Sequence, residues 1–157
     1  MLYVGRKYDA AEVEYLATLR LAPNFIAAME GLSSVYLLQK RYPEAIKLLR
    51  QVSEREKEFD MVEASLAYAY GVTGDTARAH EMLQEMERRS AHVHVTPQEL
   101  AKVHLGLGEN EKALTRLQQG YQVAEEEMMW IKTDPIFDSL RDDPRFQKIV
   151  ADMNFPP

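Results

Sequence analysis

The stretch "LQKRYPEAIKLL", residues 38–49, poses the question on which the fold depends. Its leucines, isoleucine and alanine have helical spacing, yet Pro43 interrupts them. Proline inside a helix removes a hydrogen bond and clashes with the preceding turn, whereas the first position of a helix tolerates it. The stretch therefore predicts that one helix ends near Lys40 and that a second helix begins at Pro43.

The residues around Pro43 recur along the chain at intervals of 34. The alanines in this register are Ala11, Ala45, Ala79 and Ala113, and four residues after them come Tyr15, Leu49, Leu83 and Leu117. Nine residues before the alanines come Leu2, Tyr36, Tyr70 and His104, and thirteen before them come Leu32, Leu66 and Leu100. A fixed period of this kind indicates stacked units, each of which buries its apolar face against its neighbour.

Each unit has the pattern of two amphipathic helices. In the second unit we expect one helix over residues 24–39 and another from Pro43 onward. Asp75 or Thr76 is the expected cap of the next such helix, residues 96–99 (TPQE) have the spacing of a capping box, and Asn110 is the expected cap of the helix after it. The recurring alanine is expected where two helices cross closely.

The period, the alanines and the Leu/Tyr positions resemble the tetratricopeptide repeat family, as do Gly74, Gly108 and Pro23. The chain departs from the family at Met29 and Glu63, where tryptophan is common, and at Lys57 and Ala91, where proline is common. The resemblance implies an all-α fold, a right-handed solenoid of antiparallel helix pairs with about 3.5 repeats and C-terminal capping helices. The expected units of this single domain are a partial repeat (1–23), three repeats (24–57, 58–91 and 92–125) and a capping segment (126–157).

The capping segment does not follow the 34-residue period. Asp134-Pro135 and Asp143-Pro144 each place a capping acid before proline and so predict two short helices. Their apolar faces would come from Phe137, Leu140, Phe146, Ile149 and Val150. "DPIFDSLRDDPRF", residues 134–146, resembles the ending that follows repeat arrays in bacterial multidomain proteins. This likeness implies the C-terminal interaction region of a larger bacterial regulatory or signalling protein.

The first unit begins inside its first helix, which predicts that the chain is a fragment of a longer one. Leu2, Tyr8 and Tyr15 would then form an exposed apolar patch through which the chain could self-associate as a homo-oligomer. With 25 acidic and 19 basic residues the net charge is −6, which argues against a nucleic-acid partner. The absence of cysteine fits a cytoplasmic protein, or a periplasmic one if the full-length protein has a transmembrane segment. The sequence contains no apolar run long enough to span a bilayer.

The resemblance also implies a binding surface, because the first helices of successive repeats line the concave face in this family. A protein or peptide partner is the expected ligand, with Tyr68 as the aromatic anchor. The residues expected to line this groove are Ala27, Glu30, Ser34, Leu37, Leu38, Ala64, Ser65, Tyr68, Val72, Gln98, Glu99, Lys102 and Leu105. Glu30, Gly31, Ser34 and Ser65 stand where some members carry the lysines and asparagines that grip a terminal carboxylate, so that clamp is not expected here.

Two other kinds of site were weighed against this interpretation. His80, His92, His94 and His104 could form a zinc site in a metal or small-molecule sensor, but no HExxH spacing or cysteine supports one. The acids Glu125, Glu126, Glu127, Asp134, Asp138, Asp142 and Asp143 could be imagined as catalytic carboxylates, but a solvated helix face and helix caps explain them better. No phosphate loop or nucleophile motif is present. We therefore expect a non-catalytic binding scaffold without a cofactor or metal, with self-association or sensing as alternatives.

Overall fold

The computed structural model describes residues 7–55, 60–90, 95–123, 128 and 130–153, and every regular element in this part of the chain is helical. The α-helices are α1 (Tyr8–Leu21), α2 (Ile26–Leu38), α3 (Tyr42–Ser53), α4 (Asp60–Val72), α5 (Thr76–Arg89), α6 (Pro97–Gly106), α7 (Asn110–Gln122) and α8 (Pro144–Asp152). A 3₁₀ helix, η2 (Pro135–Leu140), precedes α8. None of the described helices is both long and apolar enough to cross a lipid bilayer.

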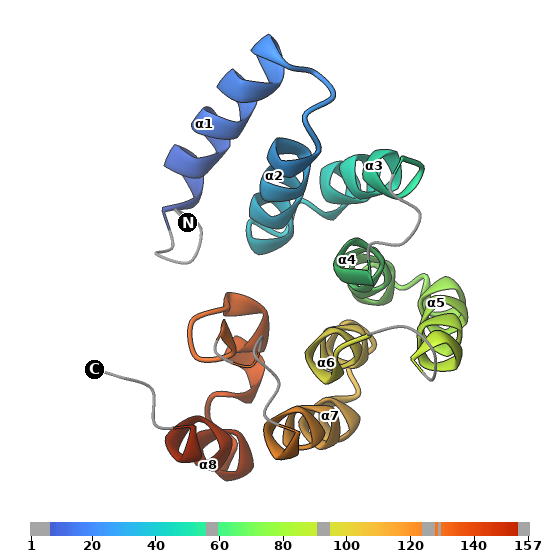
Figure 1. Ribbon diagram of the computed structural model, residues 1–157, viewed down its shortest axis with the longest axis vertical. Coiled ribbons are helices and arrows are strands. Elements are labelled where there is room, and N and C mark those ends of the chain that lie inside the picture. The colour runs from blue at the N-terminus through green and yellow to red at the C-terminus, as the bar shows by residue number, and fades with distance from the viewer. Residues whose placement is uncertain (1–6, 56–59, 91–94, 124–127, 129, 154–157) are drawn as a thin grey trace.

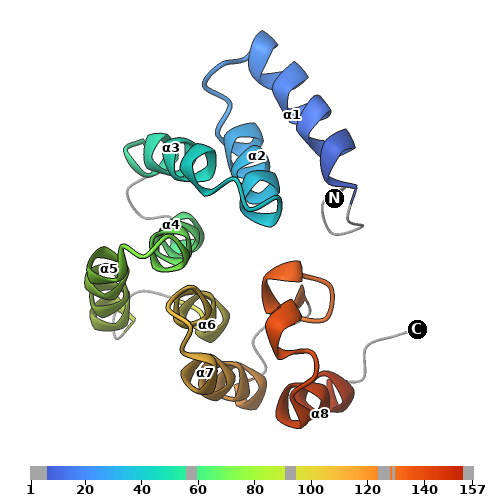
Figure 2. The same cartoon turned by 180° about the vertical axis from the view of Figure 1, so that it is seen from behind.

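The helices follow one another along a curved path (Figures 1 and 2). Helices α2, α4 and α6 lie on the inner side of the curve, and α3, α5 and α7 lie on the outer side. Each outer helix packs on the inner helix before it, and η2 returns to the inner side, where it packs against α6. The inner side is therefore where segments distant in the sequence meet.

The stretch around Pro43 forms two helices, as predicted. Helix α2 ends at Leu38 and α3 begins at Tyr42, so that Pro43 lies in the first turn of α3, where its missing N–H costs nothing. The chain reverses between them through Lys40, which has a φ of 59°. Gly74 and Gly108, 34 and 68 residues later, have φ values of 90° and 74°.

The same pair of backbone hydrogen bonds closes all three of these turns. The N–H groups of Arg41, Asp75 and Glu109 donate to the carbonyls of Tyr36, Tyr70 and His104 at 2.8, 2.9 and 2.9 Å. The N–H groups of Lys40, Gly74 and Gly108 donate to Leu37, Gly71 and Leu105 at 3.0–3.1 Å. Together these bonds form a Schellman motif, which requires a left-handed residue after the helix end. The 34-residue period of the sequence therefore recurs in the backbone geometry of these turns.

The helix starts repeat as well. Lys7, Arg41, Asp75 and Glu109 precede α1, α3, α5 and α7 with nearly equal backbone angles, φ from −79 to −92° and ψ from 57 to 62°. The expected cap at Asp75 is confirmed, since its side chain accepts from the N–H of Arg78. The expected cap at Asn110 is wrong: Glu109 holds the cap position and Asn110 is the first helical residue. The capping box of Thr96 and Glu99 is confirmed in both directions.

Lys40 is the one described non-glycine residue with positive φ, and this allows a direct test. A side chain in this conformation costs roughly 1–2 kcal/mol. We expect Lys40→Gly to raise the free energy of unfolding by about 1 kcal/mol relative to Lys40→Ala, which removes the same charge without relieving the backbone. Gly74→Ala should have the opposite sign, because an added Cβ there meets no atom within 4 Å and only the backbone is strained. Urea denaturation measures all three, and equal stability of the two Lys40 variants would contradict the expectation.

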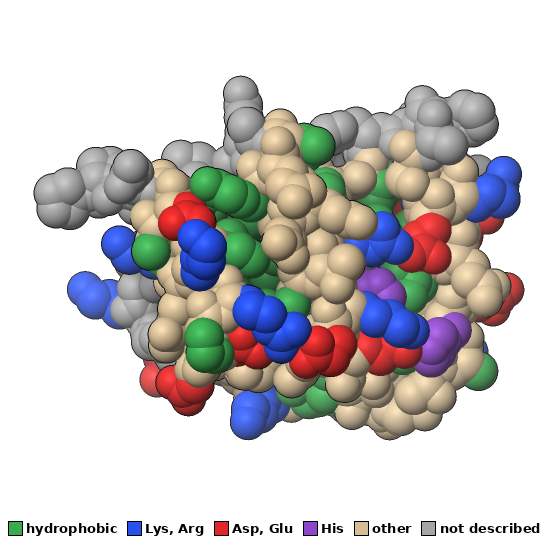
Figure 3. All heavy atoms as spheres, turned by 90° about the horizontal axis from the view of Figure 1, so that it is seen from below, with side chains coloured by type: hydrophobic (Ala, Val, Ile, Leu, Met, Phe, Trp, Pro, Cys, Tyr) green, Lys and Arg blue, Asp and Glu red, His purple; other side chains and the backbone are tan. Residues whose placement is uncertain are grey.

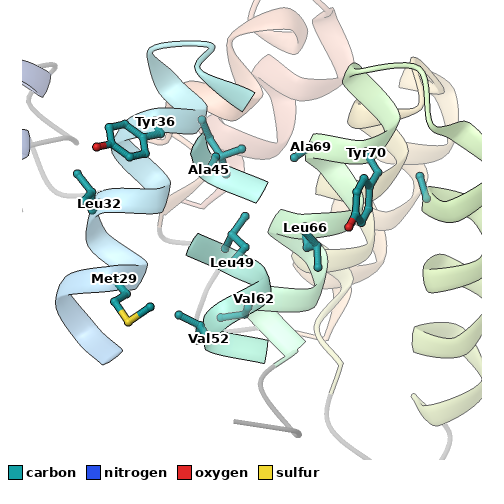
Figure 4. Packing of buried hydrophobic residues seen from close by; sticks show 12 residues of the cluster. Met29, Leu32, Tyr36, Ala45, Leu49, Val52, Val62, Leu66, Ala69 and Tyr70 are labelled. Carbon is teal, nitrogen blue, oxygen red and sulfur yellow. The ribbon is translucent and has the colours of Figure 1, made fainter. Parts of the chain in front are cut away.

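The core lies between the inner and outer helices. In Figure 4, Ala45, Leu49 and Val52 of α3 lie between the apolar side chains of α2 and α4. Ala11, Ala45, Ala79 and Ala113 are all 0–1% exposed, as expected for residues at close helix crossings. A second set of small residues in the same register, on the inner helices, is equally buried: Ser33, Ala67 and Ala101. The sequence analysis missed this second set.

Helices α4 and α6 approach each other most closely at two glycines. A Cβ added to Gly71 would lie 2.6 Å from the carbonyl carbon of Gly106, and one added to Gly106 would lie 2.5 Å from the carbonyl oxygen of Tyr68. Helix α4 consequently packs against α6 directly, whereas α2 and α4 are separated by α3 and touch little. The spacing of the inner helices therefore differs along the curve.

The C-terminal segment forms the two predicted short helices, the first of them a 3₁₀ helix. Asp134 and Asp143 cap η2 and α8 by accepting from Ile136 and Arg145 at 3.0 and 2.8 Å. Phe137, Leu140, Phe146 and Ile149 are buried with Met128 and Ile131 against α6 and α7. The apolar face that α6 and α7 would leave open is thus covered by this segment.

The expected apolar patch at the first helix needs correction. Tyr8 and Tyr15 are only half-exposed, and the Tyr15 ring lies over Gly31 of α2, while Leu2 is outside the described residues. The exposed apolar side chains of this region are instead Val13, Leu16, Leu21 and Phe25. The sequence of residues 88–95 lengthens the turn between Arg89 and Thr96 and so predicts a surface loop there. Residues 91–94 lie outside the described part, and Val95 and Thr96 after them are buried.

Candidate functional site

A narrow cleft on the inner side of the curve brings together six residues of the predicted groove. Glu30, Ser34, Leu37 and Leu38 come from α2, Ser65 from α4 and Lys102 from α6. The other residues that line the cleft are Ser33, Leu49, Met61, Val62, Asp134 and Ile136. The cavity volume is about 60 Å³. Sites for whole metabolites usually enclose about 300–1,000 Å³. The cleft therefore has room for a side chain or a short piece of backbone.

The remaining predicted groove residues lie elsewhere. Ala64 and Gln98 are buried in helix packing and have no surface to offer a partner. Glu99 is buried too, where it completes the capping box with Thr96. Ala27 and Val72 are exposed outside the cleft, and Leu105 is partly buried against the C-terminal core. The period of 34 placed these residues on the inner helices but did not show which side of each helix the next helix would cover.

Tyr68, the expected anchor, does not line the cleft but lies beside it, half-buried. Burial raises the pKa of its hydroxyl to about 12, and Tyr42 and the Asp134 carboxylate add to the effect. The phenol therefore stays neutral at physiological pH. Its hydroxyl contacts Tyr42 of α3, so the side chain contributes to packing inside the chain.

One part of the cleft wall comes from the C-terminal segment and was not predicted from the sequence. Asp134 and Ile136 face α4 and α6, and the Asp134 carboxylate lies 3.7 Å from the Lys102 ammonium. These two side chains are only 17% and 11% exposed, so the pair is partly shielded from water. The same carboxylate caps η2.

Arg141 holds the C-terminal wall in place through hydrogen bonds within the same segment. Its Nη1 donates to the carbonyl of Lys132 at 2.7 Å and its Nη2 to that of Asp134 at 3.3 Å, while its Nε donates to Asp138 at 2.6 Å. Phe137, immediately after the wall residues, is fully buried and stacks on Phe146 with ring centroids 6.4 Å apart. The C-terminal wall is therefore part of the core.

Several charged side chains on the outer helices pair with opposite charges. Figure 3 shows one face on which Lys and Arg side chains lie beside Asp and Glu, with histidine among them. Arg145 contacts Glu111 at 2.7 Å, Lys112 contacts Glu109 at 2.8 Å, and Arg116 pairs with Glu87. The guanidinium of Arg145 also holds the pKa of the Asp143 carboxyl below its ordinary value. On this face the described basic side chains therefore lie among acidic ones.

The two described histidines, His80 and His104, both lie near the carboxylate of Glu109. His104 is buried at the position that Tyr36 and Tyr70 hold in other repeats, and its Nδ1 lies 2.8 Å from Glu109 Oε2. His80 Nε2 is 3.8 Å from the other oxygen of Glu109. The Lys112 hydrogen bond, followed by that of His104, lowers the pKa of Glu109. Over residues 7–55, 60–90, 95–123, 128 and 130–153, no group of three or more His, Cys, Asp or Glu could hold a metal ion, while His92 and His94 fall outside them.

Three of the acids considered as catalytic groups have structural partners. Asp134 and Asp143 are helix caps, and Asp138 pairs with Arg141. Asp142 is exposed on the surface, and Glu125, Glu126 and Glu127 fall outside the described residues. Asp134, Asp138 and Asp143 therefore each have a structural role.

Comparison with known proteins adds no assignment. No protein-family model, no curated protein and no solved structure matches the chain.

Proposed function

We propose that this chain is a non-catalytic scaffold that binds a protein or peptide in the inner cleft of a tetratricopeptide-type solenoid, right-handed and built of antiparallel helix pairs. The 34-residue register and the three matching Schellman turns support this architecture, with unit boundaries at residues 23, 57, 91 and 125. The observation that carries the function is the convergence of residues from α2, α4 and α6 on one cleft. The resemblance of residues 134–146 supports a role as the interaction region of a larger bacterial regulatory protein.

The lining of the cleft indicates the chemistry of its ligand. Leu37, Leu38 and Met61 provide an apolar floor, and Ser34 and Ser65 provide hydroxyls that can hydrogen-bond a peptide backbone. Lys102 is already paired with Asp134, so the cleft offers little free positive charge. A peptide that inserts one apolar side chain between α2 and α4 fits this arrangement, and its binding should depend only weakly on salt.

The cleft size argues against the sensor alternative at this place, because about 60 Å³ does not enclose a metabolite. A bound peptide would instead use the cleft for one anchoring side chain and lay its remaining length on the neighbouring helices. Met61 is the natural contact for such an anchor, since it is 43% exposed and borders the cleft.

We expect Met61→Ala and Leu38→Ala each to weaken a selected peptide by about tenfold, as for apolar anchors at interface centres. Peptides would be selected from a displayed random library against the whole chain, and affinities measured by fluorescence anisotropy. Val72→Ala is the matched control, because Val72 is an exposed apolar residue of α4 outside the cleft. If no peptide is enriched, or if enriched peptides bind the cleft variants like the parent, the proposal fails.

A further inference from the structure

Helix α1 carries an exposed apolar stripe that does not pack against the other described residues. Val13 is 61% exposed, Leu21 is 90% exposed and Leu16 is 38% exposed. Ala10 and Ala17 complete a row with Val13 and Leu21 at spacings of three, four and four residues, which share one side of a helix. We call the row Ala10, Val13, Ala17 and Leu21, with Leu16 at its edge, the α1 stripe.

The opposite side of α1 already makes the contacts that its repeat position requires. Ala11 is buried, Tyr15 lies over Gly31, and Leu19 packs on the core around α2. Glu12 pairs with Arg41 at 2.8 Å. The α1 stripe therefore takes no part in the packing of α1 on α2.

At the positions of Val13 and Leu16, the apolar character of this side is particular to α1. Helices α3, α5 and α7 hold the same register, and their residues at the position of Val13 are Lys47, Glu81 and Thr115. At the position of Leu16 they carry Arg50, Gln84 and Gln118. All six of these side chains are exposed to water. These two positions are thus polar in α3, α5 and α7 and apolar in α1, which indicates that another molecule covers this side of α1.

We infer that the α1 stripe is a self-association surface, and that it pairs antiparallel with α1 of a second copy of this chain. The small Ala10 and Ala17 allow close approach, and Val13 of one copy would lie opposite Ala17 of the other. The charges at the helix ends select the direction, since α1 has Asp9 in its first turn and Arg20 in its last. Antiparallel pairing brings each Asp9 near the Arg20 of the second copy, whereas parallel pairing would bring like charges together.

The geometry also sets the strength of the pairing. A helix of 14 residues is about 21 Å long, so one helix pair buries less than a standard interface. The dimer should therefore be reversible and dependent on concentration. The inner cleft is lined by α2, α3, α4, α6 and the C-terminal segment, so this association does not depend on the proposed peptide binding.

Sedimentation velocity over a concentration series tests the inference on the whole chain. We expect a monomer–dimer equilibrium that Val13→Lys with Leu16→Arg abolishes, because this pair copies the polar surface of α3. Leu21→Lys should also abolish it, and since Leu21 is 90% exposed this variant keeps its fold, which circular dichroism verifies. Val123→Lys is the control that should still dimerise, because it changes an apolar residue after α7 that is 67% exposed and lies outside the stripe.

Charge reversal tests the direction. Asp9→Arg should weaken the dimer by about tenfold, and adding Arg20→Asp should restore it, because the reversed pair attracts again. In a parallel dimer the double reversal restores nothing. A chain that stays monomeric at all concentrations, or a dimer that Leu21→Lys and the double lysine–arginine variant leave intact, overturns the inference.

Discussion

Replacing Gly106 with alanine is expected to lower the free energy of unfolding by about 3 kcal/mol, at the upper end of the cost of overpacking a core. The new methyl group would lie 2.5 Å from the carbonyl oxygen of Tyr68 and 2.7 Å from its Cα. Alanine favours a helix over glycine by roughly 1 kcal/mol, which opposes the loss. The overlap prevails because the atoms it meets belong to the backbone of α4 and cannot rotate away.

Gly71→Ala should behave similarly, since its methyl group would meet the backbone of Gly106 from the other side. For a chain of this length a loss of this size lowers the melting temperature by about 6–12 °C. Gly120→Ala is the matched control in α7, because its methyl group would meet the flexible side chain of Met128 at 2.9 Å, which can shift. Urea denaturation compares the three, and a Gly106→Ala variant as stable as Gly120→Ala would show that α4 and α6 do not touch at these glycines.

The close contact of α4 and α6 at Gly71 and Gly106 also affects the width of the cleft. Ser65 of α4 and Lys102 of α6 both line it, and the glycine contact sets the distance between their helices. A methyl group at either glycine would push the helices apart and widen the cleft. We therefore expect the glycine variants to lose peptide affinity together with stability, whereas Gly120→Ala keeps both.

The parts of the structure that follow the 34-residue period could be predicted from the sequence. The turn before Pro43 and the buried alanines recur in the 34-residue register, so each occurrence supports the others. The cap at Asp75 could be predicted because aspartate is a preferred capping residue directly before a helical pattern. The φ of Lys40 belongs to this class as well, because Gly74 and Gly108 mark its register. Comparing the exposed positions of α1 and α3 would likewise have found Val13 and Leu16 beside Lys47 and Arg50.

The parts that break the period could not be predicted in the same way. Gly71 and Gly106 have no glycine 34 residues away in the neighbouring units, so nothing in the register indicates that α4 and α6 touch. The C-terminal wall of the cleft depends on contacts between residues remote in the sequence, such as Lys102 with Asp134, and none of them repeats along the chain. A single lysine and a single aspartate that are distant in the sequence give no sign that they lie close together until the fold is known.

Phe137→Ala is expected to cost about 3–5 kcal/mol, the largest single loss that we expect in this chain. Phe137 is fully buried and stacks on Phe146 at an interplanar angle of 23°. Its removal leaves a cavity between η2, α8 and the face of α6 and α7 formed by Ala101, Ala113 and Leu117. Because the same segment supplies Asp134 and Ile136, loosening it should also remove one wall of the cleft.

Two measurements distinguish a loosened wall from general destabilisation. Limited proteolysis of Phe137→Ala should cut first within residues 130–143, under conditions that leave α2 to α5 intact, because this segment loses its anchor while the repeat contacts remain. Trp130→Ala is the matched control: Trp130 is a larger aromatic residue of the same segment but is 43% exposed, so its loss should cost less than about 1 kcal/mol. If Phe137→Ala melts like Trp130→Ala, the C-terminal segment is not anchored by Phe137. If it unfolds as a whole without early cleavage in the segment, then the wall, α6 and α7 form one cooperative unit with the rest of the chain, and peptide binding should disappear only when the chain unfolds.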